Sequence, residues 1–343
     1  MKSLTPRFLI LLVAGLQAAL PATAQEVVFS HLLSAPMYAN PAFAGTFGAY
    51  HAGMAVRSPF TAVANVGHTA YVEGDAFLSS WNSGIGVYAM NDRFAGGVFQ
   101  TTSFGLAYAY AFRLSESMEV RPALQAVFHL HQRNPQSWLF PDVAGSGGAV
   151  AYPAGESSES RVDFAAGLLF SHPAFQSGIA VQHLGAAAAP SSWVYGAPSI
   201  KLTVHARFPL TLAGSGDLQP LREWMALENV VLSPHATYVR QGDFTYLIAG
   251  AALRSGGLAA GVALRTPLQN ATYAAVVSLG VESRSLTAGY VFDFLAAGGD
   301  LRGWNSGSHE LFLHYSFGAV DDPPQRRTGK RRRPLNPACG CPY

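Results

Sequence analysis

Apolar and polar residues alternate along Arg284 to Phe294 and again along Ser308 to Phe317. In the second run Leu311 and Leu313 share one face, whereas Glu310 and His314 share the other. Because successive side chains of a strand point to opposite faces, this period of two predicts two amphipathic strands. A polar segment rich in glycine joins them as a hairpin with a long loop. Such a pair is typical of the closing strands of an outer-membrane β-barrel.

The alternation recurs along the chain in fourteen runs, and bacterial single-chain barrels have even strand numbers. The sequence therefore predicts an all-β fold, a transmembrane antiparallel outer-membrane β-barrel of about 14 strands. Long outer and short inner connections segregate when counted from a periplasmic N-terminus, with exceptions at 240–243 and 209–226. The expected strands are 49–58, 66–77, 82–90, 101–113, 117–131, 161–171, 175–184, 200–208, 227–239, 244–253, 257–265, 271–281, 284–294 and 308–317.

Composition favours the membrane barrel over a soluble sandwich. The 343 residues are 49% hydrophobic and only 12% charged. Outside the first two dozen positions, no apolar run approaches the roughly 20 residues that a membrane-spanning helix needs. A soluble β-sandwich would share the alternation but would carry more charge on its outer face. A barrel instead turns half of every strand toward lipid while pairing every backbone group.

The chain divides into four predicted parts. Residues 1–24 have the charged, apolar and small-residue order of a secretory signal peptide, with cleavage expected after Ala24. Residues 25–48 are predicted to be an irregular N-terminal segment, punctuated by Asn40-Pro41 and Gly45, that packs inside the mouth of the barrel. Residues 49–318 form the barrel. Residues 319–343 have the composition of a disordered basic tail, which emerges in the periplasm.

The tail carries a cluster of positive charge and both cysteines of the chain. Such a run either keeps a disordered segment solvated or docks on an acidic periplasmic partner or on inner-leaflet phosphates. Cys339 and Cys341 are two residues apart, so a disulfide between them would be strained. We therefore expect neither cysteine to stabilise the fold. The candidate docking residues are Arg326, Arg327, Lys330, Arg331, Arg332 and Arg333.

Two histidines on one expected strand raise the question of a metal. His129 and His131 share a face, opposite Leu124 and Phe128, so they point into the lumen. No carboxylate or cysteine adjacent in sequence completes a ligand set. We therefore favour an ordinary polar lining, and the sequence predicts no metal and no cofactor.

Charged residues on inward faces predict a lumenal network. The first and last strands of a barrel pair, so Arg57 is expected to approach Glu310, with Asp293 on the same side. Buried charges need partners, so a satisfied network is favoured over a transport pathway. The wider set of inward charges is Arg57, Glu119, Arg121, Asp163, Arg254, Arg265, Asp293 and Glu310.

The sequence argues against an enzyme. No Gly-x-Ser-x-Gly elbow occurs, and the serines lie mostly on lumenal faces or in loops rather than with a base at the lipid interface. Nothing resembles a phosphate-binding glycine loop. The predicted compartment excludes nucleic acid as a partner.

Two segments carry recognisable motifs. One is MYANPAFAG, Met37 to Gly45, and the other is GYVFDF, Gly289 to Phe294, followed by SHELFLHYSF, Ser308 to Phe317. The residues that form these motifs are Asn40, Pro41, Ala42, Phe43, Ala44, Gly45, Gly289, Tyr290, Asp293, His309 and Glu310. With them the chain resembles the PorP/SprF family of outer-membrane proteins, which is associated with type IX secretion and gliding motility in Bacteroidetes. The chain departs from the family where Arg57-Ser58-Pro59-Phe60 replaces an Arg-x-Gln-Trp motif.

The resemblance implies a non-enzymatic barrel in the outer membrane, with both termini in the periplasm. Its expected partners are outer-membrane lipid and either type IX secretion components or a secreted adhesin with a type B C-terminal domain. The expected role is to assist secretion or cell-surface attachment of that partner. A passive or solute-selective channel is the alternative, and a surface-binding protein that uses the loop 132–160 is a third class.

Overall fold

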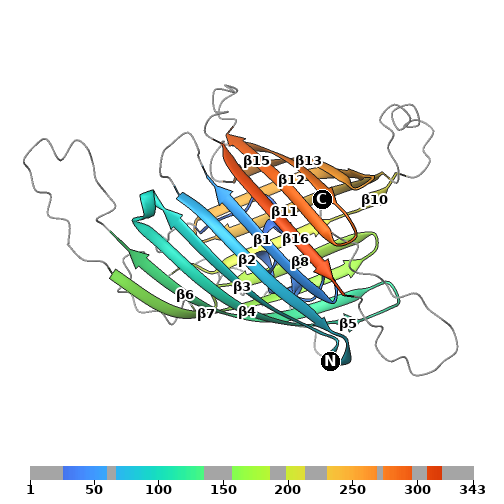
Figure 1. Cartoon of the computed structure of the whole chain (residues 1–343), viewed down its shortest axis with the longest axis horizontal. Coiled ribbons are helices and arrows are strands. Elements are labelled where there is room, and N and C mark those ends of the chain that lie inside the picture. Colours follow the sequence, from blue (N-terminus) through green and yellow to red (C-terminus); the bar gives the residue numbers. More distant parts are fainter. Residues whose placement is uncertain are drawn as a thin grey trace, which may run out of the picture.

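The computed structural model describes residues 26–59, 67–134, 157–185, 198–212, 230–268, 273–295 and 307–318. Within these ranges, fourteen long strands form one closed antiparallel barrel (Figure 1), which confirms the predicted fold class. The strands are β1 (Tyr50–Ser58), β2 (Gly67–Leu78), β3 (Ser83–Phe94), β4 (Phe99–Tyr110), β6 (Glu119–Arg133), β7 (Ser157–His172), β8 (Phe175–Gln182), β9 (Lys201–Arg207), β11 (Val231–Gln241), β12 (Phe244–Ser255), β13 (Leu258–Pro267), β14 (Ala274–Glu282), β15 (Leu286–Leu295) and β16 (Ser308–Phe317).

Neighbours in sequence are neighbours in the barrel, and β16 pairs with β1 to join the two ends of the sheet. That pairing runs from Tyr50 opposite Phe317 to Ser58 opposite His309. Two further strands of two residues each extend the wall: β5 (Phe112–Arg113) pairs with β6, and β10 (Leu210–Thr211) pairs with β11. Each of the fourteen long strands of the described wall therefore has a neighbour on both sides, which a wall in lipid requires.

Exposure alternates along the strands as the sequence predicts. On β1 the side chains of Met54 and Val56 are exposed on the outside, whereas Ala55 and Arg57 are buried inside. The same alternation separates exposed Leu311 and Leu313 from buried Glu310 and His314 on β16. An apolar outer band and a polar interior are the two faces that an outer-membrane barrel needs.

Several strands are longer than the hydrophobic pattern predicts. β3 continues to Phe94 and β7 already begins at Ser157, through polar residues that break the alternation. Asn91 and Asp92 still pair with Thr102 and Thr101 of β4, because ladder hydrogen bonds use the backbone whatever the side chain. The expected tight turn at 240–243 is a two-residue hairpin between β11 and β12. Most of the segment 209–226 lies outside the described residues.

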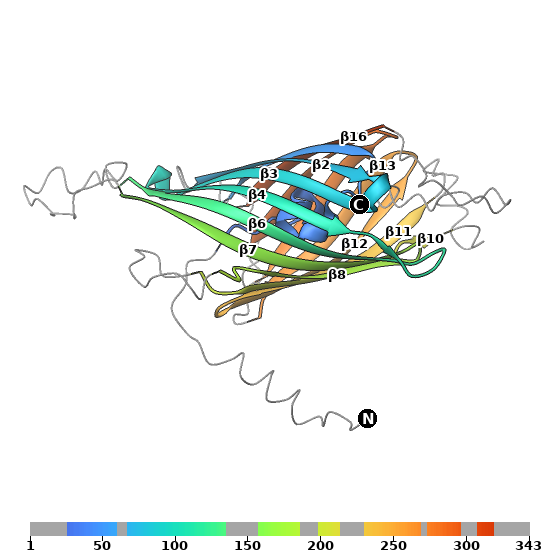
Figure 2. The same cartoon turned by 90° about the horizontal axis from the view of Figure 1, so that it is seen from below.

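The lumen contains the N-terminal segment of the chain. We call residues 26–48 the plug. It contains three short helical turns: η1 (Leu32–Ser34), α2 (Pro36–Ala39) and η2 (Pro41–Phe43). Figure 2 shows these turns inside the ring of strands. Met37, Asn40 and Ala42 are fully buried there, so the plug and the inner wall form a common core.

The barrel has two distinct ends. We call the end where β1 begins and β16 ends the terminal end, and the opposite end the loop end. Connections at the loop end include the long segments 134–156, 183–200 and 296–307, whereas the terminal end has short connections such as 173–174 and 256–257. In the described ranges, no helix is both long and apolar enough to cross a bilayer. The predicted signal peptide 1–24 and the tail 319–343 lie outside those ranges.

Candidate functional site: the plugged lumen

Asn40 fixes the plug to the barrel wall. Its side-chain oxygen accepts a hydrogen bond from the Ala42 backbone N–H at 3.0 Å and so caps η2. Its Nδ2 group faces the carbonyl oxygens of Leu168 on β7 (3.2 Å) and Ile179 on β8 (3.4 Å). One buried amide therefore organises the plug and attaches it to two neighbouring strands.

The wall makes room for this amide with two glycines. A Cβ atom at Gly167 would lie 2.2 Å from Asn40 Oδ1, and one at Gly178 would lie 2.8 Å from Asn40 Nδ2. Neither position has space for a side chain while Asn40 stays in place. The plug and these strands therefore fit only because both wall residues lack a side chain.

Buried polar side chains of the wall form hydrogen bonds with the backbone of the plug. Gln125 donates to the Met37 carbonyl at 3.2 Å, and Gln182 donates to the Tyr38 carbonyl at 2.6 Å. Arg121 contacts the Gly45 carbonyl at 3.0 Å, and Gly45 N–H donates to Asp75 Oδ1 at 2.8 Å. A short irregular segment has few internal hydrogen bonds, so polar wall residues compensate for those it lacks.

Arg57, Asp293 and Glu310 lie together on adjacent strands, as the sequence led us to expect. Arg57 NH1 is 2.8 Å from Glu310 Oε2, and Arg57 NH2 is 3.1 Å from Asp293 Oδ2. Arg265 adds a second guanidinium 3.0 Å from Asp293 Oδ2. All three residues of the predicted network are buried, so two carboxylates and two guanidinium groups balance one another inside the lumen.

The plug takes part in this network, which the sequence did not indicate. Ser30 N–H donates to Glu310 Oε2 at 3.0 Å, and Arg57 NH1 donates to Ser30 Oγ at 2.8 Å. The hydroxyls of Ser30 and Ser34 form short hydrogen bonds with Asp293 and Glu310 respectively. The charges of the wall thus hold the plug as well as one another.

The first described residue of the plug joins a second charged cluster. Glu26 lies 2.9 Å from His183 Nε2 and 3.4 Å from Lys201 Nζ. Burial raises the pKa of the Glu26 carboxyl, but the neighbouring His183 and Lys201 charges outweigh it and hold the pKa well below its usual range. His183 follows the last residue of β8; burial lowers its pKa, but Glu26 and Asp163 raise it to about 9. Lys201 Nζ also lies 4.2 Å above the Tyr38 ring.

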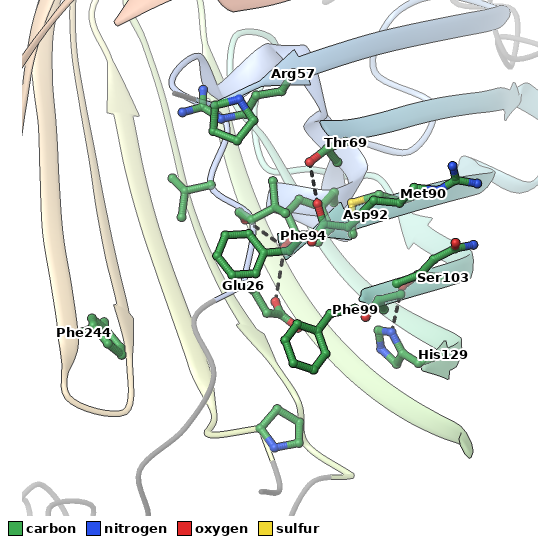
Figure 3. A pocket seen from close by; sticks show the side chains of 18 of the residues that line it. Glu26, Arg57, Thr69, Met90, Asp92, Phe94, Phe99, Ser103, His129 and Phe244 are labelled. Atoms are coloured by element: carbon green, nitrogen blue, oxygen red, sulfur yellow. Dashed lines mark hydrogen bonds between the residues drawn. The ribbon is translucent and has the colours of Figure 1, made fainter. Parts of the chain in front are cut away.

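Above the plug, toward the loop end, lies a cavity of about 1010 Å³ that we call the vestibule. Glu26, Val27 and Tyr38 of the plug line it together with strand residues from around the barrel (Figure 3). Its charged lining includes the arginines Arg57, Arg93, Arg161 and Arg265 and the carboxylates Glu26, Asp92 and Asp243. The vestibule therefore presents charges of both signs among apolar side chains such as Phe94, Phe99 and Phe244.

His129 and His131 do point into the lumen and line the vestibule. His129 Nδ1 faces Ser103 Oγ at 2.8 Å, and His131 Nδ1 faces Thr101 Oγ1 at 3.0 Å. The structure brings Asp163, remote in sequence, to 3.9 Å from His129 Nε2, and His183 lies beside it. A carboxylate does therefore approach His129, although none is adjacent to it in sequence.

The family-motif residues fall on both sides of the wall. Asn40 to Gly45 belong to the plug, and Asp293 and Glu310 bind it, as described above. Tyr290 and His309 lie on the outer side, where Tyr290 OH and His309 Nδ1 are 2.6 Å apart. The six basic tail residues and both cysteines lie outside the described residues.

Several residues that hold the plug were not singled out from the sequence: Ser30, Ser34, Gln125, Gln182, His183 and Lys201. The four from the wall lie beside or within amphipathic strands, but a period-two pattern predicts which way a residue points and not what it contacts. The arrangement is a set of structural attachments between a segment and its barrel.

Comparison with known proteins gives one family match. The profile of the family described as "Type IX secretion system membrane protein PorP/SprF" matches residues 22–315. A comparison with curated proteins found no match. Among solved structures, the Acinetobacter baumannii outer membrane protein Omp33 is 8% identical with a TM-score of 0.45, covering 80% of this chain and 100% of that chain. A Pseudomonas aeruginosa FadL homologue is 10% identical with a TM-score of 0.41, covering 86% and 99%.

Proposed function

Because the chain belongs to the family of type IX secretion system membrane proteins PorP/SprF, we propose that it is a non-enzymatic, plugged outer-membrane barrel. In this proposal it assists secretion, or attachment to the cell surface, of a partner protein such as a large adhesin with a type B C-terminal domain. The barrel supplies a fixed body in the membrane, and its two ends supply the contacts.

The plug is the observation that carries this proposal. Residues 26–48 fill the lumen from the wall network at Arg57 down to the start of β1, and Met37 and Asn40 are fully inaccessible to solvent. A polypeptide cannot pass through a lumen that its own chain occupies. The partner therefore meets the protein at an end of the barrel and not within it.

Connection length supports the orientation that we propose. Barrels of this class place long connections outside the cell and short turns in the periplasm. The loop end, with segments 134–156 and 183–200, is accordingly the extracellular end. The tail that follows β16 then lies in the periplasm, where it docks on an acidic partner through Arg326, Arg327, Lys330, Arg331, Arg332 and Arg333. Glu26, the first described residue of the plug, lies instead in the vestibule toward the loop end.

Deletion of the gene followed by cell fractionation tests the role. We expect at least one type IX cargo to be lost from the cell surface and restored by the wild-type gene. A second strain, lacking only residues 319–343, tests the tail: cargo loss in that strain supports periplasmic docking. If every cargo reaches the surface normally without the gene, the proposed role is wrong.

A channel is the second candidate, and the vestibule is the observation in its favour. A cavity of about 1010 Å³ whose lining carries charges of both signs is suited to a small ionic solute. The plug below it argues for a blind cavity. Planar-bilayer recordings distinguish a channel from a blind cavity. A channel is supported if the wild-type barrel conducts ions and if charge changes at Arg57 or Asp293 alter the conductance. A barrel that does not conduct eliminates the channel.

A further inference from the structure

A second buried cluster lies near the terminal end of the barrel, at the seam where the first and last strands meet. His51 on β1, Glu73 on β2 and His314 on β16 each offer a ligand atom, and these atoms lie within 4.8 Å of one another. All three residues are buried, with exposed fractions of 3%, 6% and 5%. None of them contributes to the Arg57 network or to the vestibule.

The strand register and one glycine bring these side chains together. Glu73 and His314 pair with the same β1 residue, Gly53, from its two sides. A Cβ atom at Gly53 would lie 2.6 Å from His314 Nδ1 and 3.0 Å from Glu73 Cγ. The missing side chain therefore lets the carboxylate and the imidazole converge across β1, where His51 projects from the same face two residues earlier.

The distances approach those of a coordination sphere. His51 Nε2 lies 3.0 Å from His314 Nδ1, and Glu73 Oε1 lies 3.8 Å from His314 Nδ1. Ligand atoms at 2.0–2.1 Å from a tetrahedral zinc ion lie roughly 3.3 Å apart. Small rotations of the side chains, within the space that Gly53 leaves, would place all three atoms on one ion.

One oxygen of Glu73 has no donor among the residues that the structure describes. Glu73 Oε2 accepts from Tyr71 OH at 2.5 Å and faces the Met37 N–H at 3.4 Å. Glu73 Oε1, in contrast, is buried without a hydrogen-bond partner in this part of the chain and faces the two imidazoles. Such an atom costs free energy unless a cation or a donor binds it.

The charges around the cluster also favour a cation. Within the described part of the chain, the ion pairs of Glu73 and Asp75 involve histidines and no lysine or arginine. Two carboxylates side by side in a buried site repel each other and need positive charge nearby. A divalent cation bound to neutral imidazoles would supply it.

Asp75 supplies the support that metal-binding histidines usually have. Asp75 Oδ2 lies 2.6 Å from His51 Nδ1, and Asp75 Oδ1 accepts from Gly45 N–H at 2.8 Å. A proton on Nδ1 of His51 leaves a lone pair on Nε2, the atom that faces His314. The Phe47 ring stacks on His51 with the centroids 4.5 Å apart and covers the cluster from the plug side.

The geometry points to a binding site for a divalent cation of the zinc class, formed by His51 Nε2, His314 Nδ1 and Glu73 Oε1, with Asp75 orienting His51. Two imidazoles and one carboxylate suit zinc, whereas magnesium and calcium prefer an all-oxygen set. The ion would join β1, β2 and β16 at the closing seam, beside Phe47 of the plug. This inference does not depend on the role in secretion.

The other histidine cluster is less suited to a metal. Asp163 already has the Arg161 guanidinium at 3.4 Å and His183 Nδ1 at 2.6 Å, and His183 also contacts Glu26. Its negative charge is therefore balanced by protein cations. This difference makes the His129 cluster the matched control for the experiment.

The test uses the full mature chain without a histidine tag, in a Cys339→Ser, Cys341→Ser background that removes the thiols of the tail. The protein is folded in detergent, loaded with zinc chloride and freed of excess ion by gel filtration, and its zinc is measured by mass spectrometry. We expect one zinc ion per chain, and a melting temperature that falls when EDTA is added.

The near-isosteric variant Glu73→Gln and the variant His314→Gln should each weaken zinc binding at least tenfold, and Asp75→Asn should weaken it about 10- to 100-fold. His129→Gln should leave it unchanged. Absence of stoichiometric zinc in the parent protein would overturn the inference. So would zinc that persists in Glu73→Gln but is lost in His129→Gln, or a melting temperature indifferent to both zinc and EDTA.

Discussion

Arg57 and Glu310 lie directly opposite each other on β1 and β16, and their side chains meet at 2.8 Å inside the lumen. The strands are the first and the last of the barrel, 253 positions apart in sequence. Ser30 of the plug hydrogen-bonds to both residues. The Arg57–Glu310 ion pair thus both links the first strand to the last and holds the plug.

Removal of one partner from this pair should be costly. Arg57→Met leaves the Glu310 carboxylate buried without its closest cation, so we expect a loss of about 3–5 kcal/mol in the free energy of unfolding. The double variant Arg57→Met, Glu310→Met should lose less than the single variant. Urea-induced unfolding in detergent, followed by tryptophan fluorescence, measures both.

The Arg254–Glu282 pair provides a control for this prediction. Its atoms lie 3.1 Å apart, but the Arg254 side chain is 27% exposed, so solvent screens the pair. Arg254→Met should cost less than about 1 kcal/mol. Equal costs for Arg57→Met and Arg254→Met would contradict the view that the lumenal pair is a buried, tightly coupled one.

Asn40→Ala should weaken the attachment of the plug to the wall without unfolding the barrel. It removes the cap of η2 and the polar contacts with β7 and β8, for which we expect a cost of about 1–3 kcal/mol. Limited proteolysis of the folded protein should then cut within residues 26–48, while the barrel strands stay resistant. Resistance of the plug equal to that of the wild type would show that Asn40 is not its main anchor.

Gly167→Ala should push the plug away from the wall, because the substitution adds a methyl group to the wall next to Asn40. The new methyl group would meet Asn40 Oδ1 at 2.2 Å and Pro41 Cδ at 3.0 Å, and we expect a loss of about 1–3 kcal/mol. The matched substitution Gly74→Ala meets its nearest atom, the His51 carbonyl oxygen, at 3.7 Å and should change stability by less than about 0.5 kcal/mol. The same unfolding assay compares them, and equal effects would argue against a tight fit at Gly167.

Attachment of the plug through Glu26 should weaken in alkali. The pKa of His183 is raised from 6.5 to about 9, so its charge stabilises the folded state fully below pH 6.5, and this contribution is lost as the pH rises through 9. The loss should be about 3 kcal/mol. Unfolding free energies at pH 6 and pH 9.5 measure it.

Glu26→Gln provides the control for this pH dependence. Without the carboxylate, the pKa of His183 should fall, and the difference in stability between the two pH values should shrink. The depressed pKa of Glu26 predicts a separate loss of stability in acid, as its carboxylate is protonated below its ordinary pKa. If the free energy of unfolding changes between pH 6 and pH 9.5 by the same amount in Glu26→Gln as in the wild type, the pH dependence arises from another group.

The local pattern of the sequence was enough to predict the wall of the barrel. Alternation with a period of two assigns Val56 to lipid and Arg57 to the lumen, because a strand has only two faces. An even number of such strands with one apolar face has to close, since an open edge in lipid leaves backbone groups unpaired. The approach of Arg57 to Glu310 follows from closure alone.

Only the tertiary structure decided how the N-terminal segment is held in the lumen and which inward residues meet besides Arg57 and Glu310. Asn40 reaches β7 and β8, more than a hundred positions away, and Glu73 and His314 converge because both flank Gly53. These contacts depend on the register between strands and on the absence of a side chain at single positions. Periodicity assigns each residue to a face, but contacts across the lumen depend on how the whole barrel closes around the plug.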